Sequence, residues 1–597
     1  MSLMSGLYVG VSGLQTSQNS LNTTAHNLSN MDTEGFVRQQ VLTGDKVYNT
    51  IKNATTKTSP QQVGLGVTYE KVRQVRDFFL DQAYRKENGR AAFYSTSYEA
   101  LNEVEDLLNE LNDDASFNHA MTNMWRTFEE LAKTPDDTTV QRMLVQNAQT
   151  FLTNASQVYQ GLVDYQNELN THIYEKVELI NELGHKIQFY NDQIRMVEAG
   201  QIESANDFRD ARNKALDTLS GLVNISYSED AFGTVSVRVE GSDFVAADNV
   251  FEMACDQDAS TGFYTPYWKV NAVQRTDPDT GLQFLDTSNA HVFNLDMTIS
   301  SEAYTDIGSL RSMLYARGDK NANYTDIPIK PEMPDITDKT KYPGGITDPQ
   351  YIIDVENYTN KMETYNRKVD YYNHTIAQSV CMNIEAEFDQ LVHNVAMAVN
   401  GVLKAAYDKG DGTYMADPDN DNMPLQIFIK KETPGYSKDA SGNWVYEEEI
   451  TDDAFMSDTL YSIPNLVINP SLIREAGKMK FVLEDGTVDF DSAKAFLDAF
   501  DADAYVLNPN VTTKCSINTY YTNLVSQVAN SGSVYKNLTE GQMATVASID
   551  HKREEVVGVS SDEELTNMIK FQNAYNAASR YINVVDEMLQ HLLQALG

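Results

Sequence analysis

The two ends of the chain carry the same pattern of hydrophobic positions. Near the N-terminus, a mostly apolar stripe with alternating spacings of four and three residues runs along Leu7, Val11, Leu14, Gln18, Leu21, Ala25 and Leu28. Near the C-terminus, the same alternation runs along Met568, Phe571, Tyr575, Ala578, Ile582, Val585, Leu589, Leu592 and Leu596. This spacing is typical of helices that pack on other helices. It predicts one helix over about residues 3–30 and another over 561–597, through which the chain joins a partner or another part of itself.

The second of these helices also has a start signal. Ser561 and Glu564 have the S-x-x-E spacing of a capping box, with Asp562 and Glu563 in the first turn, where the helix dipole favours acids. The first helix is rich in Ser, Thr, Asn and Gln, so its intrinsic helix propensity is low. We therefore expect it to be disordered in a free monomer and to fold against a partner.

Between the two ends the pattern changes several times. Residues 32–90 read as extended and loop-like. Stripes with helical spacing then run from Leu101 to Val197, interrupted at Thr134–Asp137, and predict two or three antiparallel helices. The period changes to two at about residue 222, which predicts β-strands. Helical spacing returns in 384–402 and again from about residue 511.

These patterns predict a multidomain α+β fold, because a chain of 597 residues is too long for one hydrophobic core. Its expected parts are paired, coiled-coil-like terminal helices, an antiparallel helical bundle, and β-rich outer domains inserted in the middle of the chain. The expected domains are a terminal helical domain from 1–33 and 561–597, a bundle from 34–221, 384–402 and 511–560, a β-rich outer domain from 222–318 with 403–510, and an inserted variable module at 319–383.

Charge separates the ends of the chain from its middle. The formal net charge is -40, yet residues 1–31 contain no Asp, Glu, Lys or Arg. A chain this acidic is unsuited to binding nucleic acid or anionic membrane surfaces. No window is apolar enough for a membrane span, and the N-terminus does not resemble a Sec signal peptide. We expect the middle to be solvated, the ends to be buried against partners, and any export to use another route.

Few residues suggest chemistry. Asp417, Asp419 and Asp421 resemble the start of a calcium loop, but Asn422 and Phe428 stand where Gly and a bidentate Glu would be needed. A solvated acidic loop is the favoured interpretation. The three cysteines and nine histidines match no metal-ligand spacing, and no nucleophile or phosphate-binding motif occurs. We expect no catalytic residues, no bound metal and no cofactor.

Motifs at both ends resemble those of bacterial flagellar rod, hook and hook-associated proteins. The N-terminal motif of this axial family usually reads SGL…NNxANxNTxGYxRQ, and the segment from GVSSDEEL onward is similar to its C-terminal motif. Segments 204–225, 134–151 and 388–400 are similar to the helical region of the family's hook–filament junction branch, hook-associated protein 1. The residues that match the family motifs are Ser12, Gly13, Asn27, Asn30, Thr33, Gly35, Phe36, Arg38, Gln39, Asp562, Glu563, Glu564 and Gln572.

The resemblance implies a structural protein without catalytic activity. It implies subunits that polymerise into a ring or helical layer through terminal helices lining a central channel, with β domains outside. The implied partners are copies of the chain itself, the hook protein, the second junction protein or flagellin, and a cytoplasmic export chaperone at the C-terminal helix. The implied location is the extracellular hook–filament junction, reached from the cytoplasm by type III export.

Two alternatives stay open at this point. Another axial protein, such as a hook or distal rod protein, would share both terminal motifs. A peptidoglycan hydrolase carried on an axial scaffold would also have room in the unmatched region 226–383, although no motif supports it.

Overall fold

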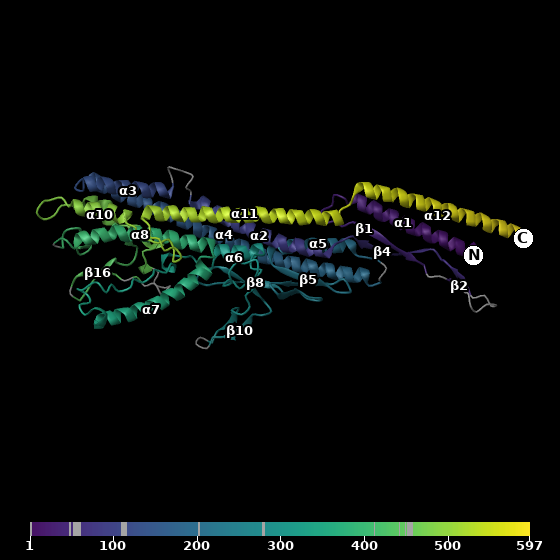
Figure 1. Ribbon diagram of the computed structural model, residues 1–597, viewed down its shortest axis with the longest axis horizontal. Coiled ribbons are helices and arrows are strands. Elements are labelled where there is room, and N and C mark those ends of the chain that lie inside the picture. The colour runs from purple at the N-terminus through teal and green to yellow at the C-terminus, as the bar shows by residue number, and fades with distance from the viewer. Residues whose placement is uncertain are drawn as a thin grey trace.

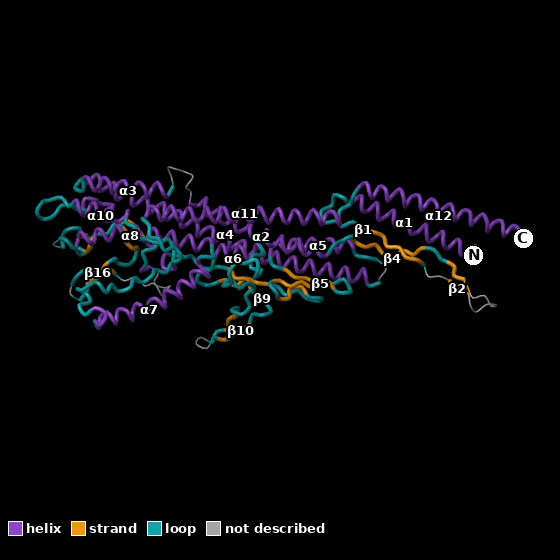
Figure 2. The backbone as a smooth tube through the Cα atoms, in the orientation of Figure 1, coloured by secondary structure: helices purple, strands orange, loops and turns teal. Residues whose placement is uncertain are grey.

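The computed structural model describes residues 3–46, 49–51, 61–108, 116–200, 203–277, 281–410, 412–440, 442–447, 449 and 458–596. The molecule is elongated, and both termini lie at the same far end of its long axis (Figure 1). The helices run mostly along this axis, whereas the strands form small separate sheets on one side (Figure 2). The multidomain α+β fold expected from the sequence is confirmed.

The two terminal helices lie side by side and extend away from the body. Helix α1 spans Leu3–Ser29 and helix α12 spans Ser561–Leu596, close to the predicted bounds. A two-stranded antiparallel hairpin, β1 (Gln39–Asp45) and β4 (Val67–Gln74), packs against α1. Strands β2 (Asn49–Ile51) and β3 (Gln61–Val63) pair farther along the same excursion. The segment expected to be loop-like therefore contains a hairpin beside the terminal pair.

Long helices form the body. Helix α4 is the longest of those described, with 61 residues, and α2 packs along α11. The bounds of these helices are α2 Phe78–Leu108, α3 Phe117–Lys133, α4 Thr138–Glu198, α5 Asn206–Leu222 and α11 Ile517–Val557. Two separate hydrophobic cores lie along α4, because its first half packs on α3 and α8 and its second half on α5 and the first sheets.

The region after α5 forms three small sheets. Val235, Val237 and Val239 point inward and their neighbours outward, so the predicted period of two is confirmed. The first sheet has the order β5-β6-β7, and two hairpins, β8-β9 and β10-β11, follow. The bounds are β5 Ile225–Glu229, β6 Val235–Val239, β7 Ser242–Val245, β8 Met253–Gln257, β9 Tyr264–Trp268, β10 Val273–Thr276 and β11 Gln283–Asp286.

The chain then leaves the body as an arm. After α6 (Ser309–Arg317), a short 3-10 turn, η1 (Tyr324–Asp326), leads to α7 (Pro349–Tyr371), none of whose residues is buried. A π-helical turn, η3 (Tyr372–Ile376), returns the chain to α8 (Val380–Tyr407). A π-helical turn is rare and marks a change of direction in a helix.

The segment after α8 corrects one sequence-based expectation. Residues 403–510 were expected to join the β-rich domain at 222–318, but their buried residues share the core of α3, α4, α8 and α11. Their strands are too short to form a sheet large enough for a core of its own. The elements are β12 Ala416–Asp417, β13 Met423–Pro424, β14 Phe428–Lys430, β15 Tyr436–Lys438, β16 Trp444–Tyr446, β17 Leu466–Ile468, α9 Pro470–Arg474 and α10 Phe490–Asp501.

Among the described helices, none combines the length and hydrophobicity that crossing a lipid bilayer requires.

Candidate functional site

Helix α1 meets α12 through small residues rather than through its apolar stripe. A Cβ atom added to Gly10 would lie 2.7 Å from Cγ1 of Ile582, and one added to Gly6 would lie 3.0 Å from the Tyr581 hydroxyl. The α12 side chains therefore approach the α1 backbone directly. The buried face of α1 consists of Gly6, Gly10, Ser12, Thr16, Ser17, Ser20, Thr24 and Asn27. Glycine allows this close approach because it lacks a side chain.

Ser17 and Ser20 on this face form their hydrogen bonds within α1. Ser17 donates to the Gly13 carbonyl at 2.8 Å, and Ser20 donates to the Thr16 carbonyl at 2.9 Å. Such bonds to the preceding turn remove the cost of burying a hydroxyl without requiring a partner on α12. A helix that looked too polar to pack can therefore be buried on one face.

The residues predicted to pack between subunits are more buried on α12 than on α1. On α12, Met568, Phe571, Tyr575, Ala578, Ile582 and Leu589 are half-buried and Val585 is buried, whereas Leu592 is exposed. On α1, Leu7, Leu14, Leu21 and Leu28 are half-buried, and Val11, Gln18 and Ala25 are exposed. The side chain of Leu596 lies outside the described residues.

Helix α12 has a second apolar face that points away from α1. Ile569 is 61% exposed, Met588 52% and Leu593 69%. Leu565 and Val584 are exposed as well. We call these five residues the outer face of α12. Together with the partly exposed stripe of α1, it leaves the terminal pair with uncovered apolar surface along most of its length.

The family-motif residues meet where the terminal pair joins the body. The carboxylate of Glu564 is almost fully buried and accepts from Arg38 Nε at 2.9 Å and from the Asn27 amide at 3.2 Å. Arg38 also pairs with the exposed carboxylate of Glu563 at 3.0 Å. Asn27 and Gln39 exchange two further bonds, from the Gln39 N–H to the Asn27 side-chain oxygen Oδ1 at 3.0 Å and from the Asn27 side-chain amide to the Gln39 backbone carbonyl at 2.9 Å. We call this cluster the terminal junction.

The terminal junction corrects the predicted capping box. The N–H of Glu563 points at the hydroxyl of Ser560, at 3.4 Å, and the N–H of Glu564 donates to the Ser560 carbonyl at 3.0 Å. The cap is therefore Ser560 and not Ser561. Glu564 does not reach back to the cap, because its carboxylate is held by Arg38 and Asn27 instead.

The linker between α1 and β1 carries the other N-terminal motif residues. Gly35 has a φ of 82°, a conformation that glycine adopts without strain. Phe36 packs edge-on against His26, with ring centroids 5.4 Å apart. Thr33 donates its hydroxyl to Asn30 at 3.3 Å, and the Asn30 amide donates to the His26 carbonyl at 3.0 Å. The motif therefore fixes the turn by which the chain leaves α1. On α12, Asp562 and Gln572 are exposed.

The body side of the terminal junction is the start of α5, within the segment 204–225. The Asp210 carboxylate accepts from the Val37 N–H at 3.3 Å and from the Gln74 amide at 2.6 Å. Burial raises the pKa of Asp210 to about 7. The backbone of Arg38 joins the end of α11 to the residue that follows β4: its N–H donates to the Val557 carbonyl and its carbonyl accepts from the Val75 N–H, each at 2.9 Å. The linker, the hairpin, α5 and the end of α11 thus converge here.

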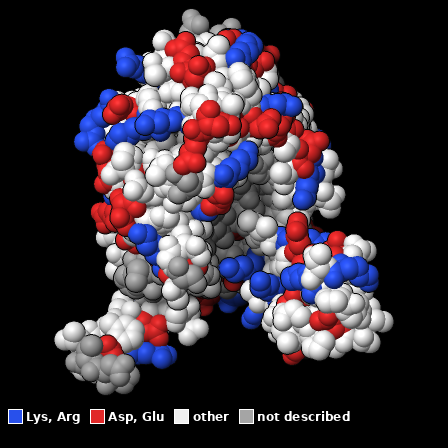
Figure 3. All heavy atoms as spheres, turned by 90° about the vertical axis from the view of Figure 1, so that its left-hand side faces the viewer, with Lys and Arg blue, Asp and Glu red and all other residues white. Residues whose placement is uncertain are grey.

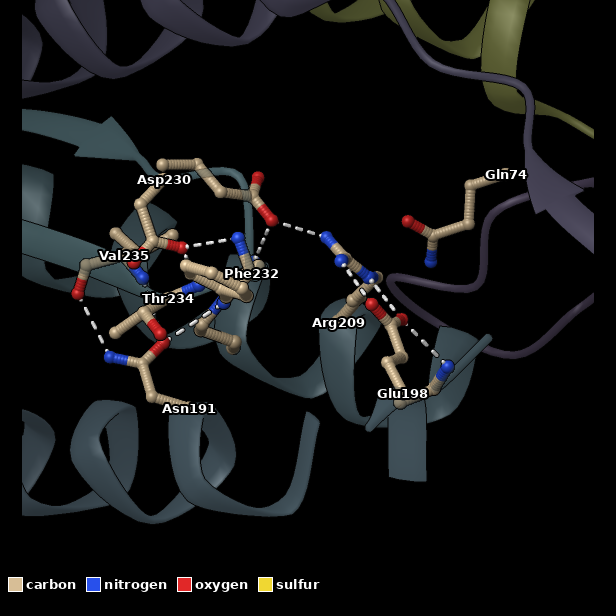
Figure 4. Close-up of polar contacts among 12 residues, drawn as sticks. Gln74, Asn191, Glu198, Arg209, Asp230, Phe232, Thr234 and Val235 are labelled. Carbon is tan, nitrogen blue, oxygen red and sulfur yellow. Dashed lines mark hydrogen bonds and ion pairs between the residues drawn. The ribbon is translucent and has the colours of Figure 1, made fainter. Parts of the chain in front are cut away.

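Two arginines of the same segment tie α5 to its neighbours. Arg209 forms a bidentate pair with Glu198 at the end of α4, at 3.0 and 2.9 Å, as Figure 4 shows. Arg212 is buried and donates to the Asn191 side chain at 2.9 Å. Asn191 in turn bonds both the N–H and the carbonyl of Val235 in β6 (Figure 4). Paired donors and acceptors make these contacts geometrically specific.

The end of α11 is fixed by a second set of charges. Arg553 pairs with Asp217 of α5 at 2.6 Å and with Asp81 of α2 at 3.2 Å. Arg85 pairs with the other oxygen of Asp217, also at 2.6 Å. Arg76 pairs with Asp81 as well. Sequence reasoning did not find these residues, although Asp217 lies within a segment that carried the family resemblance. The rigid body thus extends to Val557, immediately before the three residues that lead into α12.

The three aspartates of the acidic loop do not converge on one position in the structure. Asp417 is buried and accepts from the amides of Asn420 and Asn469, whereas Asp419 pairs with Arg474 and Lys478 and Asp421 pairs with Lys438. The three carboxylates therefore serve different partners. No group of three potential metal ligands occurs within the described residues.

Comparisons with known proteins match the two termini and the region between them. Residues 7–36 match the family of flagella basal body rod proteins, and residues 552–595 match the C-terminal family of flagellar basal body rod FlgEFG proteins. Residues 101–283 match the helical domain of flagellar hook-associated protein FlgK.

Curated relatives extend the match. Flagellar hook-associated protein 1 of Bacillus subtilis is 24% identical over 99% of this chain and 98% of its own length. The chain resembles flagellar hook-associated protein 1 along nearly its whole length. The Salmonella typhimurium protein of that name is 22% identical over 98% of both chains. A flagellar hook protein of Borreliella burgdorferi is 37% identical but matches only 11% of this chain. The resemblance identified in the sequence is therefore confirmed, and full-length similarity favours the junction branch over the hook protein.

A solved structure, that of the flagellar hook junction protein FlgK from Burkholderia pseudomallei, has a TM-score of 0.49 and 11% sequence identity. The match covers 80% of this chain and 100% of that one.

Proposed function

We propose that this chain polymerises through its terminal helices to form the junction between the flagellar hook and filament. Its similarity to hook-associated protein 1 supports a structural protein of the flagellar axis at that junction. The observation that carries the mechanism is the uncovered apolar surface of the terminal pair. In one copy, α12 covers only one face of α1, and the outer face of α12 stays exposed.

Uncovered apolar surface of this kind marks an interaction site. A neighbouring terminal pair is the suitable partner, because α1 carries no charged side chain that burial would leave unpaired. Of the net charge of -40, -37 lies between residues 32 and 560, outside the two terminal helices. Assembly therefore buries the helical pair and leaves the bodies outside, around a central channel.

The proposed role is mechanical rather than catalytic. The terminal junction is held by several charge-assisted bonds, whereas the outer face of α12 relies on packing against neighbours. Each subunit would transmit force between terminal pair and body through this cluster. The proposed partners are further copies of the chain, the hook protein, and the second junction protein or flagellin. The proposed location is extracellular, after type III export.

The outer face provides a direct test. Met588→Asp places a charge on the outer face of α12 without touching α1, so it should block assembly while the body stays folded. Leu14→Asp and Leu589→Asp should act in the same way from the partly buried stripes. Gln590→Asp is the matched control, because Gln590 is an exposed polar residue on the same helix. Filament number on complemented cells and sedimentation of purified chain are the readouts. Normal filaments with Met588→Asp would contradict the proposal.

The exposed α12 face also needs protection before assembly. We propose that a cytoplasmic export chaperone covers it, since an exposed apolar helix face promotes aggregation. A chain shortened before residue 561 should lose this partner in a pull-down from the native cell. Retention of the partner would place the chaperone site elsewhere on the chain.

A further inference from the structure

The arm that carries α7 forms a surface that the proposed role does not yet use. Helix α7 has no buried residue and contacts mainly the short turns at its own two ends. It slants away from the body at the end opposite the termini (Figure 1). One face of α7, which includes Tyr351, Val355 and Tyr358, is half-buried, and the rest of its surface is exposed to a possible partner.

A groove of about 950 Å³ lies between α7 and the segment that precedes it. Tyr358, Lys361 and Tyr365 line it from α7, and Lys330 and Met333 line it from the facing segment. We call it the arm groove. Aromatic rings and lysines together suit an acidic partner with some apolar surface.

The facing segment is extended and open to a partner. Pro328, Pro331 and Pro334 recur every third residue, the period of a polyproline II helix. Ile329 is 72% exposed and Met333 63%. The segment 328–334 is described throughout, and none of its backbone N–H groups has a hydrogen bond to another part of the described chain. It therefore offers apolar side chains and unpaired backbone to the groove.

The lysines that line the groove outnumber its acidic residues, Glu332 and Asp354, although the whole chain is strongly acidic. Lys330 and Lys361 are exposed, whereas Lys341 is already paired with Asp354 at 3.1 Å. Figure 3, which views this end of the molecule, shows lysine and arginine side chains together with some acidic ones on the lobe at its lower right, and a mixture of acidic and basic side chains over its upper part.

The end of α10 has the complementary charge. Asp498 and Asp501 lie in its last turn and Asp503 follows; all three are exposed, and none has an ion pair within the described part of the chain. No basic residue lies in that last turn. Carboxylates at a helix C-terminus oppose the helix dipole, so a cation from outside would stabilise them. Helix α10 and the arm lie at the same end of the molecule on opposite sides (Figure 1).

We propose that the arm groove of one copy receives the acidic end of α10 from the neighbouring copy. This inference rests on the proposed function, because it needs copies that stand side by side. The contact joins two different surfaces on opposite sides of the chain, so its repetition around an axis forms a ring or an open helical layer. It would hold the bodies together at the end far from the terminal pairs.

Crosslinking tests the contact in the full chain. Chains with normal and heavy nitrogen are mixed and treated with a carbodiimide, which joins lysine amines to neighbouring carboxylates. Mixed-isotope crosslinks from Lys330 or Lys361 to Asp498, Asp501 or Asp503 are expected in the soluble fraction, the sedimented polymer, or both. Their absence from both fractions overturns the inference. Polymer that forms without these crosslinks leaves the proposed function intact, whereas absence of polymer refutes that function separately.

Charge reversal supplies the matched variants. Lys330→Glu with Lys361→Glu removes the reactive amines, so association of this variant is measured by sedimentation instead, and it should weaken roughly tenfold, the loss expected when two exposed ion pairs become repulsive. Lys339→Glu is the control, because Lys339 is exposed on the arm outside the groove lining. Mixing the double variant with Asp498→Lys/Asp501→Lys chain should restore association. The inference is overturned if the double variant associates as strongly as the unchanged chain. It is also overturned if weaker retention on a heparin column is the only property that the double variant loses.

Discussion

Replacing Glu564 with alanine should loosen the terminal pair from the body without unfolding the body. The Glu564 carboxylate joins α12 to the linker through Arg38 and to the end of α1 through Asn27. Alanine removes both acceptors at a position that is 2% exposed, so water cannot readily replace them. The terminal junction then keeps the backbone bonds, the two bonds between Asn27 and Gln39, and the exposed pair between Arg38 and Glu563.

The magnitude follows from the exposure of the partners. Breaking a fully buried pair costs about 3–5 kcal/mol. The Arg38 side chain is 26% exposed and keeps Glu563, so about 2–3 kcal/mol is the appropriate range for Glu564→Ala. A local opening free energy lowered by this amount corresponds to a roughly 30- to 150-fold larger opening constant.

Hydrogen exchange of the full chain measures that opening. Peptides from the first turns of α12 and from β1 should exchange faster in Glu564→Ala, while peptides from α8 in the main core stay unchanged. Glu563→Gln is the matched control, because the side chain of Glu563 is 62% exposed and its pair should contribute less than about 1 kcal/mol. The reasoning is refuted if Glu564→Ala leaves these exchange rates unchanged, or if the wild-type junction already exchanges as fast as an unfolded peptide.

Two further predictions concern packing and pH. Gly10→Val should weaken the pairing of α1 and α12 by about 1–3 kcal/mol, because the valine side chain would overlap Ile582. Gly541→Val, at an exposed position of α11, should change this pairing little. Hydrogen exchange of α1 peptides distinguishes the two variants. Burial raises the pKa values of Glu385 and Asp389 to about 8, so the folded chain binds more protons than the unfolded chain and stability falls as pH rises toward that value. The urea midpoint should therefore be lower at about pH 8 than at about pH 6.5, and Glu385→Gln should reduce the difference; a midpoint that rises with pH would contradict the sign.

The extents of the terminal helices and the contact face of α12 could be predicted from the sequence, but the contact face of α1 could not. A four-three spacing fixes the type and length of an element, and α1 and α12 follow it. The pattern selects the largest apolar side chains as the contact face. The structure uses Gly6, Gly10 and their small neighbours on α1, because the apolar side chains of α12 need room against its backbone. This choice depends on the partner helix and is not encoded in α1 alone.

The terminal junction, too, could be predicted only in part from the sequence. Its residues Asn27, Arg38 and Glu564 were found by family motif, yet their mutual contacts were not. Glu564 was assigned to a capping box because a local motif is visible in sequence, whereas a partner more than 500 residues away is not. The short strands of 403–510 illustrate the same limit, since burial against α8 rather than local propensity decides their domain.

The separation of the bonded residues along the chain has a consequence for the order of folding. Asn27 and Glu564 are 537 residues apart, so their contact closes almost the whole chain into one loop. Closing a loop of this length costs chain entropy before the contact stabilises anything. We therefore expect it to close late, after the intervening segments have folded. A chain that emerges gradually, from either end, cannot make this contact until its last helix has arrived. The terminal pair therefore forms only in a chain that has both of its terminal helices. A truncated chain can fold its body but cannot present the paired surface that a growing polymer would accept.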